Sequence, residues 1–427
     1  MKIIKKIRKK RRKLIRRFFK SPIKKRLAQY SKTHPRFRKC WKKILYTKRR
    51  IYYWWRGLGV TPDEKTVVFN SFNGKTYGCS PKAVYEYMLT QDEFKDWTFI
   101  WAFKNAKKHR FLEENPNTIV VKQTARVYEK KLIRAKYWIT NYRVPDHVWP
   151  QKDQVYVQCW HGTPLKRLGY DLETSENAID SIADIRKKYA MDAEKFNYIL
   201  SPSGFASEKF TSAWNLKETK MEDKVMEIGY PRNDFLINHT QEDIRMIKEK
   251  LEIPEDKKVI LYAPTWRDNQ HEAGTGFTYD LNVDFDALRQ ELGDEYVILF
   301  RVHYLVASKF SFDDYEGFIY NVSNYDDINH LYLIADLLIT DYSSVFFDYG
   351  ILKKPMLFYM YDLEDYKDSI RGFYFGIDKL PGKIITKEEE LPDAIRDSID
   401  NFVYDDNTGN STKPSANGKM VRQASVL

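Results

Sequence analysis

The chain has 427 residues but only three cysteines, Cys40, Cys79 and Cys159, and their spacing matches no CxxC or zinc motif. So sparse and odd a set indicates reduced thiols in a cytosolic setting and excludes a disulfide framework. No apolar run approaches the ~20 residues that span a bilayer. The start also lacks the apolar core of about 7–15 residues that marks a signal peptide, so we expect none.

The common phosphate and metal motifs are missing too. A P-loop read back from Gly74-Lys75-Thr76 would need its first glycine at Phe69. Pro62 stands where a dinucleotide fingerprint starting at Gly57 would need its third glycine. HExxH and GxSxG do not occur, and no strand end carries a convincing Asp-x-Asp pair. These absences exclude the usual sequence signatures of kinases, dehydrogenases, metalloproteases and serine hydrolases, and we expect neither metal nor cofactor.

Acidic residues are absent from the first 60 positions, which hold 25 Lys and Arg. The remainder holds 47 basic against 59 acidic residues, a net charge of −12 beside the +13 of the whole chain. Nucleic-acid-binding proteins more often carry their positive charge on the folded domain, so we expect no nucleic-acid partner.

The basic arm, residues 1–60, has the pattern of a cationic amphipathic helix. Ile4, Ile7, Leu14 and Phe18 fall near one helical face, and the aromatic cluster 52–55 follows. Both features are typical of segments that lie on an anionic membrane surface, here at the cytoplasmic face. An RNA-binding tail and an unstructured basic tail are the alternatives.

From residue 66 onward, short apolar strands alternate with amphipathic helices. The first series of strands consists of "TVVFNSF", "WTFIWAF", "TIVVKQ", "YWITNYRVP" and "VYVQCW". A second series begins with "YILSPS". Such alternation predicts parallel sheets covered by helices on both faces. We therefore expect an α/β fold of two doubly wound, Rossmann-like domains that face a cleft, over residues 61–190 and 191–404, with a loose tail over 405–427.

Five predicted strands end in polar residues, and ligands of open α/β sheets bind at such ends. Thr163 can cap a helix with Pro164 in its first turn, and Ser343 can cap another, so both mark candidate phosphate sites. The alternatives are ordinary caps, an Arg267–Asp268 ion pair and a core histidine at 161. Gly162 favours a ligand site, because it permits close approach of a ligand. The five ends are His161–Pro164, Tyr230–Asp234, Pro264–Asp268, Arg301–His303 and Asp341–Ser344.

Five stretches of the chain together resemble the CDP-glycerol glycerophosphotransferase family, over roughly residues 67–400. They are "FNGKTYGCSPKAVYEYM", "WHGTPLK", "YPRND", "YAPTWRD" and "TDYSSVFFDYGILKKPMLFY". These are the teichoic acid primases and polymerases of Gram-positive bacteria. The resemblance implies a GT-B-type fold whose C-terminal half binds the CDP-polyol and whose N-terminal half faces the acceptor. One departure is Arg301-Val302-His303, where the family often has Lys-Pro-His. The donor-binding positions that the resemblance implies are His161, Gly162, Thr163, Pro164, Leu165, Arg232, Pro264, Thr265, Arg301, Val302, His303, Ser343, Ser344 and Asp348.

The implied reaction transfers glycerol phosphate or ribitol phosphate from CDP-glycerol or CDP-ribitol to an acceptor. That acceptor is a polyprenyl-diphosphate-linked saccharide or polyol phosphate, and CMP is released. We expect His161 to be the base and His303 to assist the departing CMP, although the two roles can be exchanged. Asp348 either orients a hydroxyl or is a solvated helix acid. The alternatives for the whole chain are a nucleotide-sugar glycosyltransferase of the same fold and a catalytically silent membrane-bound scaffold.

Overall fold

The computed structural model describes residues 30, 34–173, 181–265, 271–272, 276–277, 282–302, 312–364 and 372–404. The chain divides into two compact units. One consists of Met1–Val60 with Pro145–Trp149, and the other of Thr61–Val144 with Pro150–Leu427. In the first unit, helix α3 (Pro35–Gly57) has Pro35 at its start, and Arg50 lies over the ring of Trp149 at 4.9 Å. Residues 1–29 and the predicted tail 405–427 lie outside the described residues.

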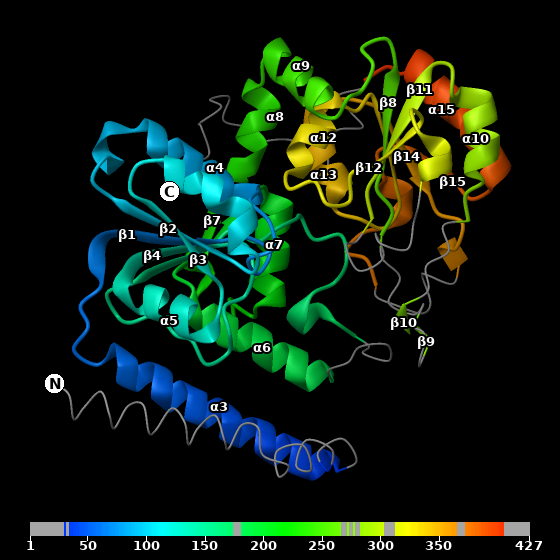
Figure 1. Cartoon of the computed structure of the whole chain (residues 1–427). Helices are drawn as coiled ribbons and strands as arrows, with labels where there is room; N and C mark the ends of the chain where they lie inside the picture. Colours follow the sequence, from blue (N-terminus) through cyan, green and yellow to red (C-terminus); the bar gives the residue numbers. More distant parts are fainter. Residues whose placement is uncertain are drawn as a thin grey trace. The chain divides into compact units, whose positions relative to one another are not determined.

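The first sheet of the second unit has seven parallel strands in the order β3-β2-β1-β4-β5-β6-β7 (Figure 1). They are β1 (Asp63–Asn70), β2 (Thr98–Phe103), β3 (Thr118–Lys122), β4 (Ala135–Thr140), β5 (Val155–Gln158), β6 (Tyr198–Ser201) and β7 (Val225–Glu227). The helices between them are α4 (Cys79–Thr90), α5 (Ala125–Arg134), α6 (Ile182–Lys195) and α7 (Gly204–Ala213), with 3-10 turns η1 (Asp92–Phe94), η2 (Ala106–Glu114), η3 (Gly169–Asp171), η4 (Glu222–Lys224) and η5 (Pro231–Asn233).

The second sheet has six parallel strands in the order β12-β11-β8-β13-β14-β15. They are β8 (Lys258–Tyr262), β11 (Tyr296–Phe300), β12 (Ile319–Asn321), β13 (Leu337–Thr340), β14 (Met356–Tyr359) and β15 (Lys383–Ile385). The helices are α8 (Asp234–Asn238), α9 (Gln241–Lys250), α10 (Phe285–Leu292), α12 (Ile328–Ile334), α13 (Val345–Tyr349) and α15 (Leu391–Asp400). The 3-10 turns are η6 (Asp313–Tyr315), η7 (Gly350–Leu352), η8 (Ile377–Lys379) and η9 (Glu388–Glu390), and β9 (His271–Glu272) pairs antiparallel with β10 (Gly276–Phe277).

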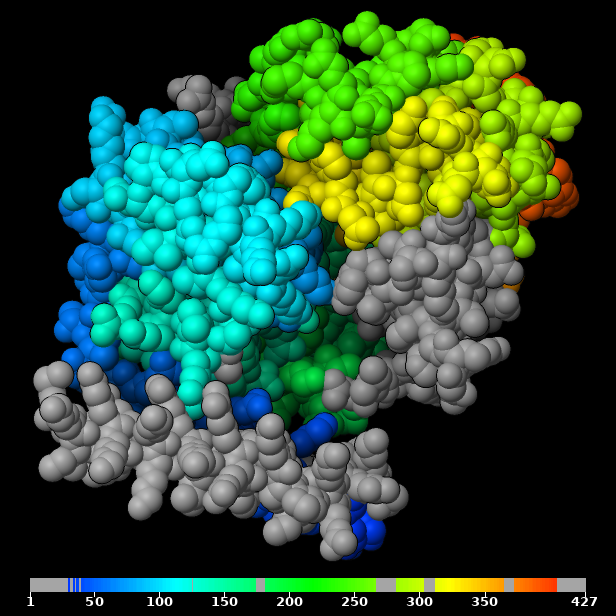
Figure 2. All heavy atoms as spheres, viewed as in Figure 1, coloured from blue at the N-terminus to red at the C-terminus, as the bar shows by residue number. Residues whose placement is uncertain are grey.

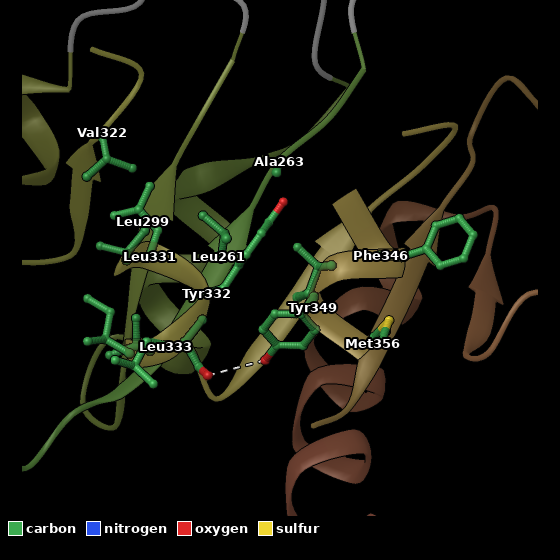
Figure 3. Close-up of a cluster of buried hydrophobic side chains, with 14 of the residues drawn as sticks. Leu261, Ala263, Leu299, Val322, Leu331, Tyr332, Leu333, Phe346, Tyr349 and Met356 are labelled. Carbon is green, nitrogen blue, oxygen red and sulfur yellow. Dashed lines mark hydrogen bonds between the residues drawn. The ribbon is translucent and has the colours of Figure 1, made fainter. Parts of the chain in front are cut away.

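The strand sequences explain why both sheets are parallel and covered on both faces. β1 and β8 are apolar over successive residues and bury them, so side chains pointing to either face are removed from water. Two apolar clusters lie on the faces of the second sheet, and Figure 3 shows part of one of them. There Tyr349 satisfies its buried hydroxyl by donating to the carbonyl oxygen of Ala335 at 3.2 Å.

The fold class predicted from the sequence is confirmed, but the domain boundary drawn near residue 190 needs correction. β6 and β7 follow that boundary, yet both pair within the first sheet, so the change of sheet comes after Glu227. The segments "YILS" and "VME" have no feature that assigns them to one sheet rather than the other. Strand pairing over long sequence separations decides this, and a local pattern does not contain that information.

Candidate active site

His161 lies just beyond the carboxyl end of β5. Cys159 extends the sheet by donating its N–H to the carbonyl of Thr140 at 2.7 Å, and Trp160 then turns the chain with φ at +49°. The Nδ1 of His161 is 2.9 Å from the carbonyl oxygen of Asn141, directly after β4. Because a carbonyl only accepts, Nδ1 must bear the proton, and Nε2 of the neutral ring has a free lone pair.

The surroundings of His161 keep it neutral. The residue is exposed to solvent, and its ring has two aromatic neighbours, the Trp160 ring at 4.5 Å and the Phe72 ring at 5.9 Å. Burial lowers the pKa of His161 to about 4; the hydrogen bond to Asn141 opposes this, and the charge of Arg232 adds to it. At neutral pH the side chain is therefore an uncharged, solvent-reachable base.

The predicted helix at Thr163-Pro164 is wrong, because no helix starts there. Both residues are buried in a loop whose backbone pairs with a distant segment. The N–H of Arg167 donates to the carbonyl of Gly372 at 3.0 Å, and the N–H of Tyr374 donates to the carbonyl of Leu165 at 2.9 Å. The backbone groups of this loop thus have partners about 200 residues away, and the sequence around Thr163 does not reveal them.

Two neighbours in this loop contact the second sheet directly. Leu165, expected to bind substrate, belongs to the apolar cluster of the second sheet. A Cβ added to Gly162 would lie 2.6 Å from Oγ of Ser344. In this structure the group that approaches Gly162 is therefore a serine side chain, and the close approach of a ligand stays a prediction.

The strand ends of the second sheet gather most of the other predicted residues. The Oδ1 of Asp341 accepts from the N–H of Thr265 at 2.8 Å and from the N–H of Tyr342 at 2.6 Å, which ties the ends of β8 and β13 together. Ser344, not Ser343, is the residue before α13, and Oγ of Ser343 accepts weakly from the N–H of Val345 at 3.4 Å. Pro264 is half-buried beside Thr265.

At the end of β11, Arg301 donates through Nη1 to the carbonyls of Val322 and Tyr325, each at 2.9 Å. Burial lowers its pKa, although the nearby phenol and carboxylates oppose the shift. Val302 is buried in the core of the second sheet, and its N–H donates to Oγ of Ser323 at 3.1 Å. His303 and Arg267 lie outside the described residues.

Arg232 and Asp348 are placed differently from our expectation. Their side chains are 5% and 8% exposed, and Nη2 of Arg232 lies 2.6 Å from Oδ2 of Asp348. Asn233 donates to the other carboxylate oxygen at 3.0 Å, and Arg232 also donates to Sγ of Cys79 at 3.1 Å. Asp348 is therefore no solvated helix acid, and the two charges neutralise each other instead of facing substrate.

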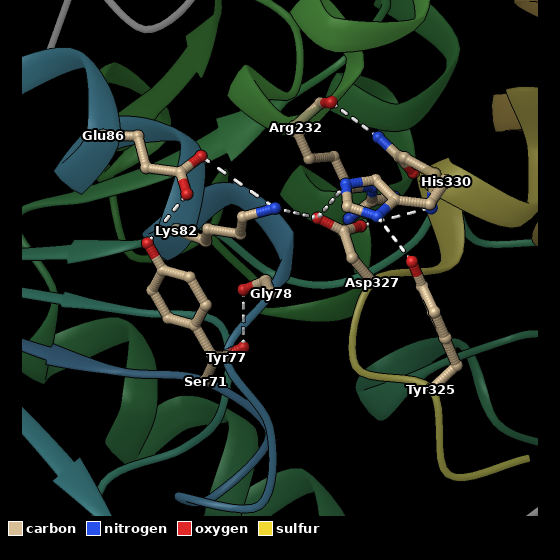
Figure 4. A network of polar contacts seen from close by, with 10 residues as sticks. Ser71, Tyr77, Gly78, Lys82, Glu86, Arg232, Tyr325, Asp327 and His330 are labelled. Atoms are coloured by element: carbon tan, nitrogen blue, oxygen red, sulfur yellow. Dashed lines mark hydrogen bonds and ion pairs between the residues drawn. The ribbon is translucent and has the colours of Figure 1, made fainter. Parts of the chain in front are cut away.

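A second polar network, which sequence reasoning missed, links the two sheets through α4 (Figure 4). Nζ of Lys82 lies 2.7 Å from Oδ2 of Asp327, just before α12, and 3.9 Å from Oε2 of Glu86. Burial opposes the charge of Lys82, but Asp327 and Glu86 raise its pKa. Lys108 pairs with Asp326, the neighbour of Asp327, at 2.8 Å. Figure 2 shows cyan and yellow parts of the chain meeting on one face of the molecule. The motif "GCSPKAVYEY" contains Lys82, but its partner Asp327 lies 245 positions away along the chain.

Within the described ranges, no group of three or more His, Cys, Asp or Glu side chains is arranged to hold a metal ion. Asn141 is another residue that sequence reasoning overlooked, although the rule that selected five strand ends also applies to it, since it follows β4 directly.

Comparison with known proteins identifies close relatives. The model of the CDP-Glycerol:Poly(glycerophosphate) glycerophosphotransferase family matches residues 56–412. The teichoic acid poly(glycerol phosphate) polymerase of Bacillus subtilis (strain 168) is 43% identical over 334 residues, which are 78% of this chain and 44% of that protein. The teichoic acid glycerol-phosphate transferase of Staphylococcus aureus (strain NCTC 8325 / PS 47) is 40% identical over 350 residues, 81% of this chain and 87% of that one.

A solved structure of the wall teichoic acid polymerase TagF, soaked with CDPG, superposes with a TM-score of 0.79 at 36% identity. The alignment covers 91% of this chain and 95% of that one. The chain spans less than half the length of the Bacillus subtilis polymerase that it matches, so the match concerns a part of that longer protein.

Proposed function

The chain belongs to the CDP-glycerol:poly(glycerophosphate) glycerophosphotransferase family, and on this premise we propose that it transfers polyol phosphate from a CDP-polyol to a teichoic acid acceptor. The donor is CDP-glycerol or CDP-ribitol, and the acceptor is linked to a polyprenyl diphosphate lipid. CMP is the second product. The observation that carries this proposal is His161, a neutral base whose Nε2 lone pair is free at the end of β5.

In the proposed reaction, an acceptor hydroxyl attacks the phosphorus that bears the polyol. The new P–O bond forms as the bond to CMP breaks, CMP leaves with the electron pair of that bond, and the hydroxyl proton passes to Nε2 of His161. A bound diphosphate raises the pKa of this histidine by Coulomb attraction, so the imidazolium that forms is stabilised where it is needed. His303 is proposed to assist the departing CMP.

The donor is proposed to bind at the strand ends of the second sheet. The half-buried Arg301, Thr265, Ser343 and Ser344 follow three of its strands there, and carboxyl ends of parallel strands share one edge of a sheet. Gly162 and Ser344 approach closely, which supports placing His161 within reach of a donor held at this edge. The ion pair between Arg232 and Asp348 is proposed to hold together the elements that carry the site.

A donor-selection assay tests the function. The purified chain is incubated with a lipid-linked acceptor and one donor in each of three reactions: CDP-glycerol, CDP-ribitol or UDP-sugars. The masses of the products are measured by mass spectrometry. The proposal expects CMP release and addition of polyol-phosphate units. Turnover of UDP-sugars alone would instead establish the nucleotide-sugar glycosyltransferase, and no turnover of any donor would favour the scaffold.

Association with an anionic membrane surface at the cytoplasmic face is also proposed, through the basic arm. Near the end of α3, exposed Ile51, Trp54 and Trp55 follow the helical spacing i, i+3, i+4. Leu58, directly after the helix, is also exposed. Exposed cations accompany these apolar residues at Lys42, Lys43, Lys48 and Arg49. Aromatic side chains beside cations suit the headgroup region of a bilayer. No helix in the described part of the chain is both long and apolar enough to cross a bilayer.

A further inference from the structure

Asn141 contacts two elements of the candidate active site at once. It is fully buried at the position after β4. Its backbone carbonyl accepts the Nδ1–H of His161 at 2.9 Å, and its side-chain Oδ1 accepts the backbone N–H of Phe72 at 2.7 Å. One residue therefore links the histidine to the turn that follows β1.

That turn is strained. Phe72, Asn73 and Gly74 have φ angles of +45°, +56° and +71°, three left-handed residues in succession. For residues other than glycine this conformation costs about 1–2 kcal/mol each. Such strain persists where the surroundings hold it, typically at functional sites. The Phe72 ring, placed by this turn, meets the His161 ring edge-on at 5.9 Å.

The asparagine side chain holds a backbone that the sheet supports only weakly. The N–H of Asn141 is 3.4 Å from the carbonyl of Asn70, at the frayed end of the ladder, whereas the side-chain bond to Phe72 measures 2.7 Å. Nδ2 of Asn141 is buried without an acceptor in the described part of the molecule. An unsatisfied donor costs about 1–3 kcal/mol, so the side chain adds little net stability.

We propose that Asn141 is a positioning residue for His161. Its side chain fixes the carbonyl that holds the Nδ1–H tautomer, and this leaves Nε2 as the basic nitrogen. The hydrogen bond at one ring nitrogen decides which nitrogen of a neutral histidine carries the proton. Without the side chain the carbonyl shifts, the Nε2–H tautomer becomes populated, and that form cannot accept a proton at Nε2. Only the expected effect of Asn141 on turnover rests on the proposed function; its expected effect on the tautomer of His161 does not.

The test compares Asn141→Ala, Asn141→Asp and, as a control for the loss of one side-chain to backbone hydrogen bond, Asn197→Ala at an exposed residue. Asn197 also accepts a backbone N–H through Oδ1, from Tyr156 at 2.8 Å, but at the opposite end of β5. The tautomer of His161 is read directly from 15N spectra of histidine-labelled protein, with the His161 signal assigned from a His161→Gln variant. kcat, KM for the CDP-polyol and the urea midpoint are measured in parallel.

We expect the wild type and Asn197→Ala to show Nδ1–H, and Asn141→Ala to show a mixture of tautomers. In Asn141→Ala, kcat falls about 10- to 100-fold with little change in donor KM, the cost of a slightly misplaced group. Asn141→Asp keeps an acceptor for Phe72 and recovers most of the rate. Its carboxylate moves the acidic limb of the pH profile to higher pH, because negative charge favours the imidazolium.

Retention of the pure Nδ1–H tautomer in Asn141→Ala with an unchanged kcat would overturn the proposal. So would an equal loss of kcat in Asn197→Ala, which would indicate general destabilisation. If Asn141→Ala does not fold, the rate and the pH profile of Asn141→Asp decide whether Asn141 positions His161. A wild type that turns over no CDP-polyol would refute the proposed function, while the spectra would still decide the positioning.

Discussion

Arg232 and Asp348 form a buried ion pair, Nη2 to Oδ2 at 2.6 Å, between the loop after β7 and helix α13. The pair therefore joins the loop that follows the last strand of the first sheet to a helix that lies between strands β13 and β14 of the second sheet. Asn233 donates a further hydrogen bond to Asp348, and Arg232 donates one to Cys79. The charge of Arg232 also helps to keep His161 neutral.

Removing one partner of this pair should be costly. We expect Asp348→Asn to lower the free energy of unfolding by about 3–5 kcal/mol, because the guanidinium is left buried without its counter-charge. The double variant Arg232→Met/Asp348→Leu should lose less than Asp348→Asn alone. Urea unfolding curves measure both, and a midpoint of Asp348→Asn equal to that of the wild type would refute this account of the pair.

The pH dependence follows from the depressed pKa of His161. The base must be neutral, so kcat/KM, which reports the free enzyme, should fall only as the pH drops through about 4. The acidic limb of kcat should lie at higher pH, because the bound diphosphate raises the pKa. A limb of kcat/KM at the ordinary histidine pKa of about 6.5 would contradict the environment described for His161.

A side chain at Gly162 should require the Ser344 hydroxyl to move. The Cβ of Gly162→Ala would lie 2.6 Å from Oγ of Ser344 and 3.4 Å from its Cβ. We expect about 1–3 kcal/mol of destabilisation from this overlap. The double variant Gly162→Ala/Ser344→Ala should regain most of that stability in thermal unfolding. Failure of the second change to recover any stability would place the cause elsewhere.

The aromatic residues of α3 should contribute to membrane binding. Trp54→Ser/Trp55→Ser should weaken sedimentation with anionic vesicles, and added salt should weaken it further, because the neighbouring cations are screened. Val403, exposed outside the arm, provides the control Val403→Ser. Equal sedimentation of the aromatic variant and the control would refute the assignment of these aromatic residues to the membrane.

Much of the fold was predictable because its information is local. The strands that bury successive apolar residues, such as β1 and β8, were recognised, and their polar ends predicted the edge at which we propose the site. The family was also predictable from five short motifs, and the comparisons confirm it.

What the sequence did not predict depends on partners far along the chain. Asp348 pairs with a residue 116 positions away, and the loop at Leu165 pairs with residues near 374, so neither a solvated acid nor a capped helix forms. The role of Asn141 lies in a backbone carbonyl, a group that every residue has. Only the geometry of β4 and β5 distinguishes it.

The central claim is that His161 accepts the proton of the acceptor hydroxyl. Single-turnover CMP release from CDP-glycerol, measured by rapid quench with wild type and His161→Gln at saturating acceptor, tests it most directly. General-base catalysis contributes about 10²- to 10⁴-fold, so the account predicts a loss of that size with an unchanged urea midpoint. A His161→Gln variant that releases CMP at more than about a tenth of the wild-type rate would contradict it.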